Sequence, residues 1–293
     1  MENNLLKTNQ FKIVGKLLSA DIRTGNRKDN GQGYVSVNAV IGSTINGKSC
    51  EYEVAFFANQ LTQDGKESKL YTSYCKLNEL VNKKVQVTGD IRENRFWSER
   101  NGVMSSKQEL SGRFVNGVVD STMDEATYEL GGFIVKSLIE KRNKNDEVYR
   151  YDVTIGQSNY SGNGMSMYTL HINPNDHDIV RGLEDYEVGS TLVIGGNLSF
   201  TVETVTRAMD NMGGFGDAPM KTFTNKQRNF FVTYGSEPIT EVEKGCYETS
   251  VIKALIEAYK AHDVELMNKS VKSEAVAPVV KEAPVTRRQT SLI

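Results

Sequence analysis

The residue spacing that most resembles a chemical site lies at residues 42–49, GSTINGKS, which match the pattern G-x-x-x-x-G-K-S of phosphate-binding loops. Such a loop leads from a buried strand into a helix, and its backbone amides and lysine hold the phosphates of a nucleotide. Here the next residues, CEYEVAFF, alternate like a strand, and Asn46-Gly47 is a strong hairpin signal. We therefore predict a β-hairpin at this position in place of a nucleotide-binding loop.

Other residue types that carry catalysis are few and scattered. The histidines His171, His177 and His262 have no cysteine pair nearby, so solvated or capping roles suit them better than metal ligation. Glu51 and Glu53 follow the alternation of a strand and do not form an acid–base dyad. We expect a protein that is not an enzyme and that needs neither a metal ion nor another cofactor.

The strongest functional signal is the segment 85–115, where basic and aromatic residues follow one another. Binding of single-stranded nucleic acid without sequence preference needs aromatic faces for base stacking and cations that follow the phosphates. The candidate stacking residues are Trp97, Phe57, Phe96, Tyr52 and Tyr34. The candidate phosphate contacts are Arg23, Arg27, Lys28, Arg92, Arg95, Arg100 and Lys107, with Lys141, Arg142 and Lys144 further along the chain.

The same segment resembles the bacterial-type single-stranded DNA-binding proteins, the SSB family. In that family V-x-V-x-G-x-[IL]-R, a tryptophan and an Asn/Asp-Gly turn form the fourth strand and its hairpin, as VQVTGDIR, Trp97 and Asn101-Gly102 do here. The strands FKIVGKLLSADI and EYEVAFFANQ are also similar to that family. The resemblance covers residues 8–118 well and 128–238 weakly.

The resemblance implies that Trp97, Phe57 and Tyr52 stack on bases. One extra residue precedes Trp97 relative to the family spacing, so either Phe96 or Trp97 faces the nucleic acid. Some members of the family carry two oligonucleotide-binding (OB) domains in one chain and dimerise, which implies a homodimer here. The family tail ends in acids and an apolar tip that recruits repair proteins; here the tip, Leu292-Ile293, persists without the acids. This departure suggests a bacteriophage-encoded protein.

Two segments of the chain read almost alike, which predicts a duplicated domain. Residues 11–41 and 128–156 each contain a strand with a glycine, a basic turn and an alternating strand. Later, VQVTGDIREN aligns with LVIGGNLSFT, so that Gly89 matches Gly196. Each half runs through three strands, a short helix (76–81 or 176–183) and two strands, the order of a five-stranded Greek-key barrel of the OB type. We predict a mainly β protein with two tandem OB-fold barrels.

The charge differs between the halves. Residues 1–120 hold 17 Lys and Arg against 13 Asp and Glu, or +4, whereas residues 121–245 hold 11 against 18, or −7. A polyanion is expected to bind the half of the chain that carries the net positive charge. We therefore expect residues 1–120 to be the principal DNA-binding OB domain and residues 121–245 to be a weaker binding or assembly OB domain. A C-terminal helix over 246–267 and a disordered tail over 268–293 complete the expected organisation.

These features predict the setting and partners. Three scattered cysteines suit a reducing cytoplasm, that of the host for a virus, and no apolar run is long enough for a membrane helix. We expect sequence-independent binding of single-stranded DNA in replication or recombination, with replication proteins recruited through the C-terminal tip. The alternatives are an RNA-binding OB protein and a structural protein that uses OB barrels as a virion scaffold.

Overall fold

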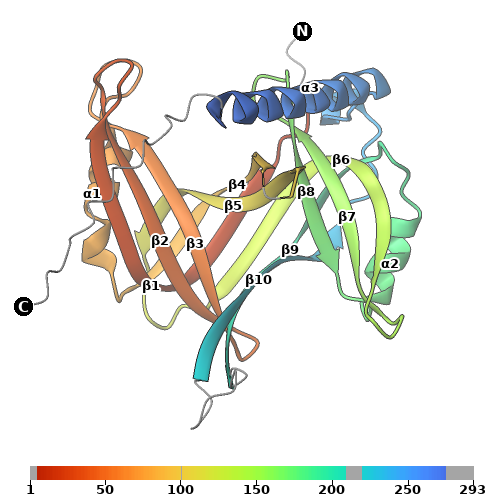
Figure 1. Ribbon diagram of the computed structural model, residues 1–293, viewed down its shortest axis with the longest axis horizontal. Coiled ribbons are helices and arrows are strands. Elements are labelled where there is room, and N and C mark those ends of the chain that lie inside the picture. Colours follow the sequence, from red (N-terminus) through yellow and green to blue (C-terminus); the bar gives the residue numbers. More distant parts are fainter. Residues whose placement is uncertain (1–4, 100, 209–219, 275–293) are drawn as a thin grey trace, which may run out of the picture.

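The computed structural model describes residues 5–99, 101–208 and 220–274, and these are mainly β (Figure 1). The first half contains β1 (Asn9–Asn26), β2 (Gly33–Ile45), β3 (Lys48–Asn59), α1 (Lys69–Cys75), the 3₁₀ helix η1 (Leu77–Leu80), β4 (Lys84–Ser98) and β5 (Val103–Gly117). The second half contains β6 (Glu125–Arg142), β7 (Val148–Ser158), β8 (Met165–Ile172), α2 (His177–Glu184), β9 (Thr191–Ala208) and β10 (Met220–Gly235), followed by η2 (Val242–Lys244) and α3 (Thr249–Glu274). The predicted order of three strands, a helix and two strands therefore occurs twice.

Each half closes into a barrel through one parallel contact between otherwise antiparallel strands. In the first half β3 pairs with β5 at Val54 and Leu110, and in the second half β8 pairs with β10 at His171 and Phe231. Alternate residues of β2 and β3 are buried, so one face of these strands fills the barrel while the other faces outward. This closure confirms the predicted two-barrel fold of the OB type.

The matching glycines of the two halves, Gly89 and Gly196, have the same structural role. A Cβ atom at Gly89 would fall on the carbonyl oxygen of Ser111, and one at Gly196 would fall on that of Phe231. In both places the last strand of the barrel crosses too close for any larger residue. The equivalence supports the interpretation of the sequence as a duplication.

Residues 42–49 form the end of β2 and the start of β3, as predicted for a hairpin. Asn46 and Gly47 occupy the turn with φ values of 50° and 74°, and Ile45 pairs with Lys48. The element that begins at Lys48 is the strand β3 and not a helix, so this segment lacks the helix N-terminus that a phosphate-binding loop provides.

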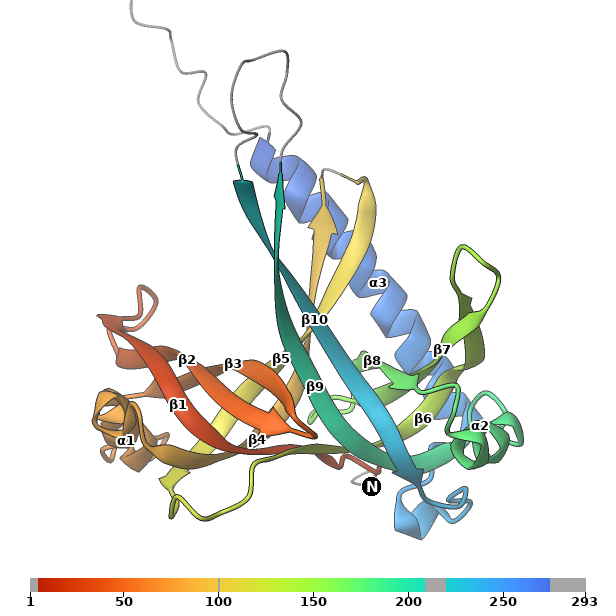
Figure 2. The same cartoon turned by 90° about the horizontal axis from the view of Figure 1, so that it is seen from below.

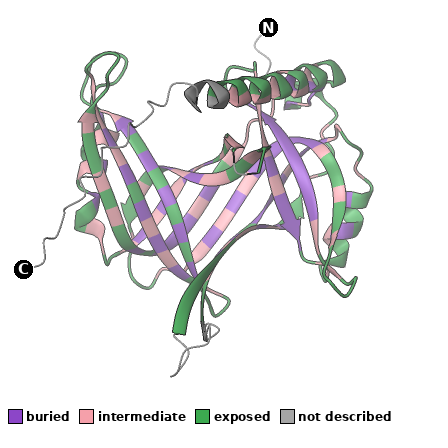
Figure 3. Cartoon of the chain, in the orientation of Figure 1, coloured by how far each residue is buried: buried purple, intermediate pink, exposed green. Residues whose placement is uncertain are grey.

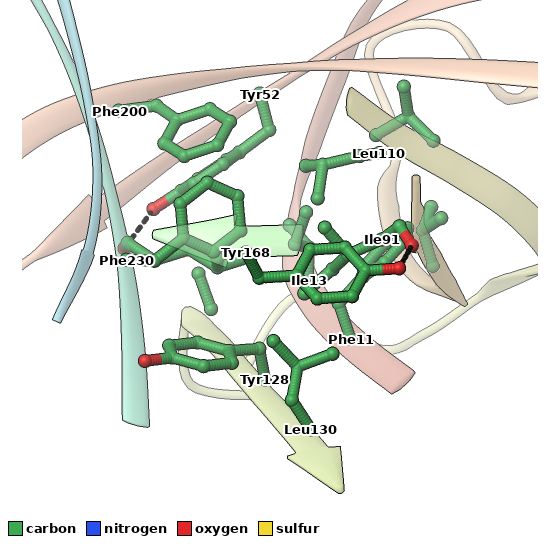
Figure 4. Packing of buried hydrophobic residues seen from close by; sticks show 14 of the residues in the cluster. Phe11, Ile13, Tyr52, Ile91, Leu110, Tyr128, Leu130, Tyr168, Phe200 and Phe230 are labelled. Carbon is green, nitrogen blue, oxygen red and sulfur yellow. Dashed lines mark hydrogen bonds between the residues drawn. The ribbon is translucent and has the colours of Figure 1, made fainter. Parts of the chain in front are cut away.

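The two barrels share one sheet and one core. β1 pairs with β6 from Asn9–Leu130 to Val14–Glu125, and β3 meets β9 at Cys50 and Thr201. Figure 4 shows the aromatic residues at this junction, which follow one another from Tyr52 through Phe200 and Phe230 to Tyr128 with ring centroids 5.2–5.6 Å apart. The halves are therefore packed against each other as parts of one body.

The helices agree with expectation in part: η1 lies within the predicted segment 76–81 and α2 matches the predicted segment 176–183, whereas α1 precedes its predicted segment and the bounds of α3 are shifted. The first α-helix begins at Lys69, before the predicted segment 76–81, because Ser68 caps it by accepting a hydrogen bond from the backbone of Tyr71. α3 runs to Glu274, so residues 268–274, predicted to be disordered, are helical. The remainder of the predicted tail, including Leu292 and Ile293, lies outside the described residues.

α3 lies across one side of the molecule, over both halves (Figure 2). Its Ile252 and Leu255 belong to a small core with Phe133 and Tyr247, while its outward side is exposed (Figure 3). Nowhere in the described ranges is a helix both long and apolar enough to span a membrane.

Candidate nucleic-acid interface

An aromatic platform lies on the outer face of β2 and β3 in the first half. Phe57 is 50% exposed, because its neighbours Phe56 and Ala58 take the inward positions of β3. The ring of Tyr34 on β2 stacks on Phe57 with centroids 5.8 Å apart and planes 25° apart. The guanidinium of Arg27 lies 5.9 Å from the centre of the Phe57 ring. We call these three residues the aromatic platform.

Two further predicted cations lie in this part of the first half. Arg23 on β1 pairs in register with Ser36, which itself pairs with Phe57, so Arg23 lies two strands away from the platform ring. Its guanidinium forms an exposed ion pair with Asp21 at 2.6 Å. Lys28 is exposed in the turn between β1 and β2. A phosphate would therefore compete with a weak, solvent-screened partner at Arg23.

The hairpin of β4 and β5 has two different faces. Phe96 is 47% exposed and shares one face with Arg92; on β5, Lys107 lies opposite Asn94 on the same face. Trp97 points to the other face and is half-buried. The outward face thus presents one exposed aromatic ring next to two cations, of which Lys107 forms an exposed ion pair with Glu109 at 3.1 Å. Stacking and phosphate contact require this combination of groups.

The inward face of this hairpin is covered by α3, which overturns the expectation for Arg95. The Arg95 guanidinium lies 3.3 Å from the centre of the Tyr259 ring and pairs with Asp263, and its side chain is 9% exposed. Glu93 on the same face accepts hydrogen bonds from the Tyr259 hydroxyl at 2.6 Å and from the backbone N–H of Met167 at 2.8 Å. Arg95 therefore binds the C-terminal helix and is not available to a phosphate.

Burial changes the acidity of Tyr259 in a way that supports this contact. Removal from water, with the neighbouring Glu93 carboxylate, raises the pKa of the Tyr259 hydroxyl above its usual range. The hydroxyl accordingly stays protonated and donates to Glu93. The ring and the carboxylates together hold Arg95 in place.

Tyr52, predicted to stack on bases, lies in the core instead. Its side chain is fully buried, its hydroxyl donates to the carbonyl oxygen of Leu198 at 3.0 Å, and its ring packs on Phe200. The sequence held a signal for this outcome, because Tyr52 shares the alternation of Val54 and Phe56 whereas Phe57 has the opposite parity.

The basic residues of the second half lie in and beside the β6–β7 turn. Arg142 pairs with Glu140 at 2.5 Å and with Asp146 at 3.7 Å, and Lys141 lies 3.9 Å from Asp152. Lys144 is exposed in the turn. Lys141 and Arg142 therefore have acidic neighbours, which accords with the negative balance of this half. Arg100 lies outside the described residues.

Two residues that lie between the halves, Lys7 and Tyr160, were not identified in the sequence analysis. Lys7 precedes β1, and Tyr160 lies in the turn between β7 and β8; the Tyr160 side chain is 97% exposed. Both line a groove of about 550 Å³ together with Arg92. Local pattern gave no indication of them, because the groove forms only when the two barrels pack together.

Comparison with solved structures finds similar proteins at low sequence identity. The wild-type single-stranded DNA-binding protein from Thermus aquaticus superposes with a TM-score of 0.50 at 11% identity over 80% of this chain and 95% of that chain. A deletion variant of that protein gives 0.47 at 12% identity over 80% and 97%. A replication protein A heterotrimer bound to single-stranded DNA gives 0.22 at 14% identity over 80% and 51%.

Among curated proteins no sequence matches this chain. The similarity to the wild-type Thermus protein supports the two-barrel OB architecture and, at its low identity, no more than the architecture. A family model described as YorF matches residues 7–270, which include both barrels and most of α3. The chain therefore belongs to the YorF family.

Proposed function

We propose that this protein binds single-stranded DNA without sequence preference, in replication or recombination, and does so without catalysis. The observation that carries the proposal is the aromatic platform, in which Tyr34 and Phe57 are stacked and Arg27 lies over the exposed ring. Aromatic faces stack on any base, and cations follow any phosphate chain, so this combination does not select a sequence. An OB fold shared with a single-stranded DNA-binding protein supports the same conclusion.

The principal binding surface belongs to residues 1–120 in this proposal. The aromatic platform and the outward face of the β4–β5 hairpin both lie there, and that half carries the positive balance. The phosphate contacts are Arg23, Arg27, Lys28, Arg92 and Lys107. Residues 121–245 contribute more weakly or serve in assembly, because that half has an excess of acidic residues.

Fluorescence anisotropy with three labelled probes tests the proposal. The full chain should bind oligo(dT) saturably, bind a duplex of the same length more weakly, and lose affinity linearly on a log–log salt plot at roughly 0.7 per phosphate contact. Tighter binding to oligo(U) than to oligo(dT) would assign the protein to RNA. If the protein binds neither oligo(dT) nor oligo(U), the proposed binding of single-stranded nucleic acid is wrong, and an assembly role is favoured.

A further inference from the structure

A groove runs between the two barrels, where β4 of the first half faces the β7–β8 turn of the second. It encloses about 550 Å³, and its walls include Lys7, Asp90, Arg92, Arg113 and Tyr160. Its volume lies within the range of protein sites that hold small organic ligands. Arg92 belongs both to the outward face of the β4–β5 hairpin and to the groove, so a nucleic acid that follows this face can continue into the groove.

The floor of the groove is a hydrogen-bonded network that joins the halves. The Asn9 amide donates to the backbone oxygen of Ile91 at 2.9 Å, to the Gln157 side chain at 3.1 Å and to the Tyr168 hydroxyl at 3.0 Å. Gln157 in turn donates to the carbonyl oxygens of Thr8 and Gly131 at 2.6 and 2.7 Å. These largely buried groups satisfy one another's hydrogen-bonding capacity, which leaves the walls of the groove to recognise a ligand.

The charge of the walls favours an anion. Arg113 and Asp90 neutralise each other in an ion pair at 2.7 Å. The Lys7 ammonium donates to the backbone oxygen of Tyr160 at 3.0 Å and retains its charge, and Arg92 forms no ion pair within the described part of the chain. Glu93 also lines the groove, but its carboxylate is engaged by Arg95, Tyr259 and the backbone of Met167. Lys7 and Arg92 thus remain as groove cations with no ion-pair partner among the described residues, at positions suited to phosphate groups.

Tyr160 adds an aromatic face beside these cations. The Lys7 ammonium lies 5.7 Å from the centre of its ring, and no other described ring stacks on it. The turn that carries it is held by hydrogen bonds from Asn159 to Asn163 at 2.9 Å and from the Ser161 hydroxyl to Asn163 at 2.6 Å. A solvated ring on a structured turn can receive a base without reorganisation of the backbone.

We propose that this groove binds a single-stranded nucleic acid as it crosses from the first barrel to the second, with phosphates on Lys7 and Arg92 and a base stacked on Tyr160. The inference rests on the proposed function and deepens it, because it gives the acidic second half a defined contact with the strand. The single-stranded nucleic acid would then follow the aromatic platform, the β4–β5 hairpin and the groove in succession.

The test compares Tyr160→Ala with the matched control Tyr160→Phe, which keeps the ring, in the full chain. The probes are oligo(dT) of about 4–8 nucleotides, which one barrel can hold, and of about 30 nucleotides, which reach both barrels. Tyr160→Ala should weaken binding of the longer probe about tenfold and leave the shorter probe unchanged, and Tyr160→Phe should match the original chain. Lys7→Ala should lower the salt slope for the longer probe by about 0.7.

The outcomes separate this inference from the proposed function. If Tyr160→Ala binds both probes like the original chain while Phe57→Ala weakens both, the groove proposal is overturned and the function stands. If the original chain binds neither probe, both fail. Competition for the groove by polyglutamate as strong as that by oligo(dT), lost in Lys7→Ala, would assign the groove to an acidic polypeptide and overturn the proposal.

Discussion

Neighbouring aromatic residues on one strand have opposite roles in this protein. Phe56 is buried against Tyr74 in the first barrel, whereas Phe57 carries the aromatic platform on its surface. The same alternation separates Phe96 from Trp97 in the β4–β5 hairpin. The single tryptophan, for which the resemblance to the SSB family implies a stacking role, therefore lies on the same face of β4 as Arg95, which contacts Tyr259 of α3.

We expect Phe96 and not Trp97 to contact the single-stranded DNA. Phe96→Ala should weaken binding of oligo(dT) by about 1–3 kcal/mol, the usual contribution of one stacked base. Trp97→Ala should change the affinity less and the stability more, because its ring is half-buried. Anisotropy titrations and urea unfolding of both variants measure the two quantities. A larger loss of affinity in Trp97→Ala than in Phe96→Ala would reverse the assignment.

A buried histidine predicts how stability depends on pH. His171 lies 2.9 Å from Asp152, which also pairs with Arg150 at 2.8 Å, and burial lowers the pKa of His171 below its usual 6.5. The unfolded chain therefore gains this proton first as the pH falls below 6.5, so the free energy of unfolding should decrease until the folded pKa is reached. Urea unfolding at pH 7.5 and 5.5 should show a smaller decrease in His171→Gln; an equal decrease would exclude His171 as the cause.

At the scale of the elements, alternation and turn residues predicted the strands of both barrels, the hairpin at Asn46-Gly47 and the match of Gly89 with Gly196. They did not predict the start of α1, because a short helix depends on its cap at Ser68 more than on its own residues. The contact of Arg95 with Asp263 joins residues 168 positions apart. Local sequence carries no signal for such a pairing, so Arg95 appeared to be a phosphate contact.

The pairing of α3 with the β4–β5 hairpin predicts a selective loss of stability. Asp263→Ala removes the carboxylate from Arg95, whose side chain is 9% exposed, and should lower the free energy of unfolding by about 1.5–3 kcal/mol. Glu257→Ala, an exposed acidic residue of the same helix, should change it by less than about 0.5 kcal/mol. Urea unfolding measures both. Equal effects of the two substitutions would show that the Arg95 contact does not hold the helix.

At the scale of the whole molecule, the two barrels are coupled by the core at their junction. Tyr52 of the first half and Phe230 of the second both pack on Phe200, and β1 pairs with β6. Composition and spacing indicated two domains bounded near residue 120, the first the principal binding domain and the second a weaker binding or assembly domain. They gave no measure of this shared core, because the residues that form it read as ordinary interior positions in each repeat.

Phe200→Ala should therefore destabilise both halves together. The substitution leaves a cavity between the barrels and should lower the free energy of unfolding by about 3–5 kcal/mol in one cooperative transition. Phe223→Ala, which removes a 47% exposed ring from the same β9–β10 hairpin, is the matched control and should have little effect. Calorimetry that resolves two independent transitions in Phe200→Ala, one of them unchanged, would contradict the coupling.

The aromatic platform is tested most directly by the affinity of Phe57→Ala for oligo(dT), with Phe114→Ala as control. The two phenylalanines belong to the same half and are exposed to 50% and 53%, but within the described residues only Phe57 stacks on a ring and lies beneath a guanidinium. In anisotropy titrations Phe57→Ala should lose about 1–3 kcal/mol of binding free energy, and Phe114→Ala should bind like the original chain. Unchanged affinity in Phe57→Ala, or an equal loss in both variants, would contradict the proposed mode of single-stranded DNA binding.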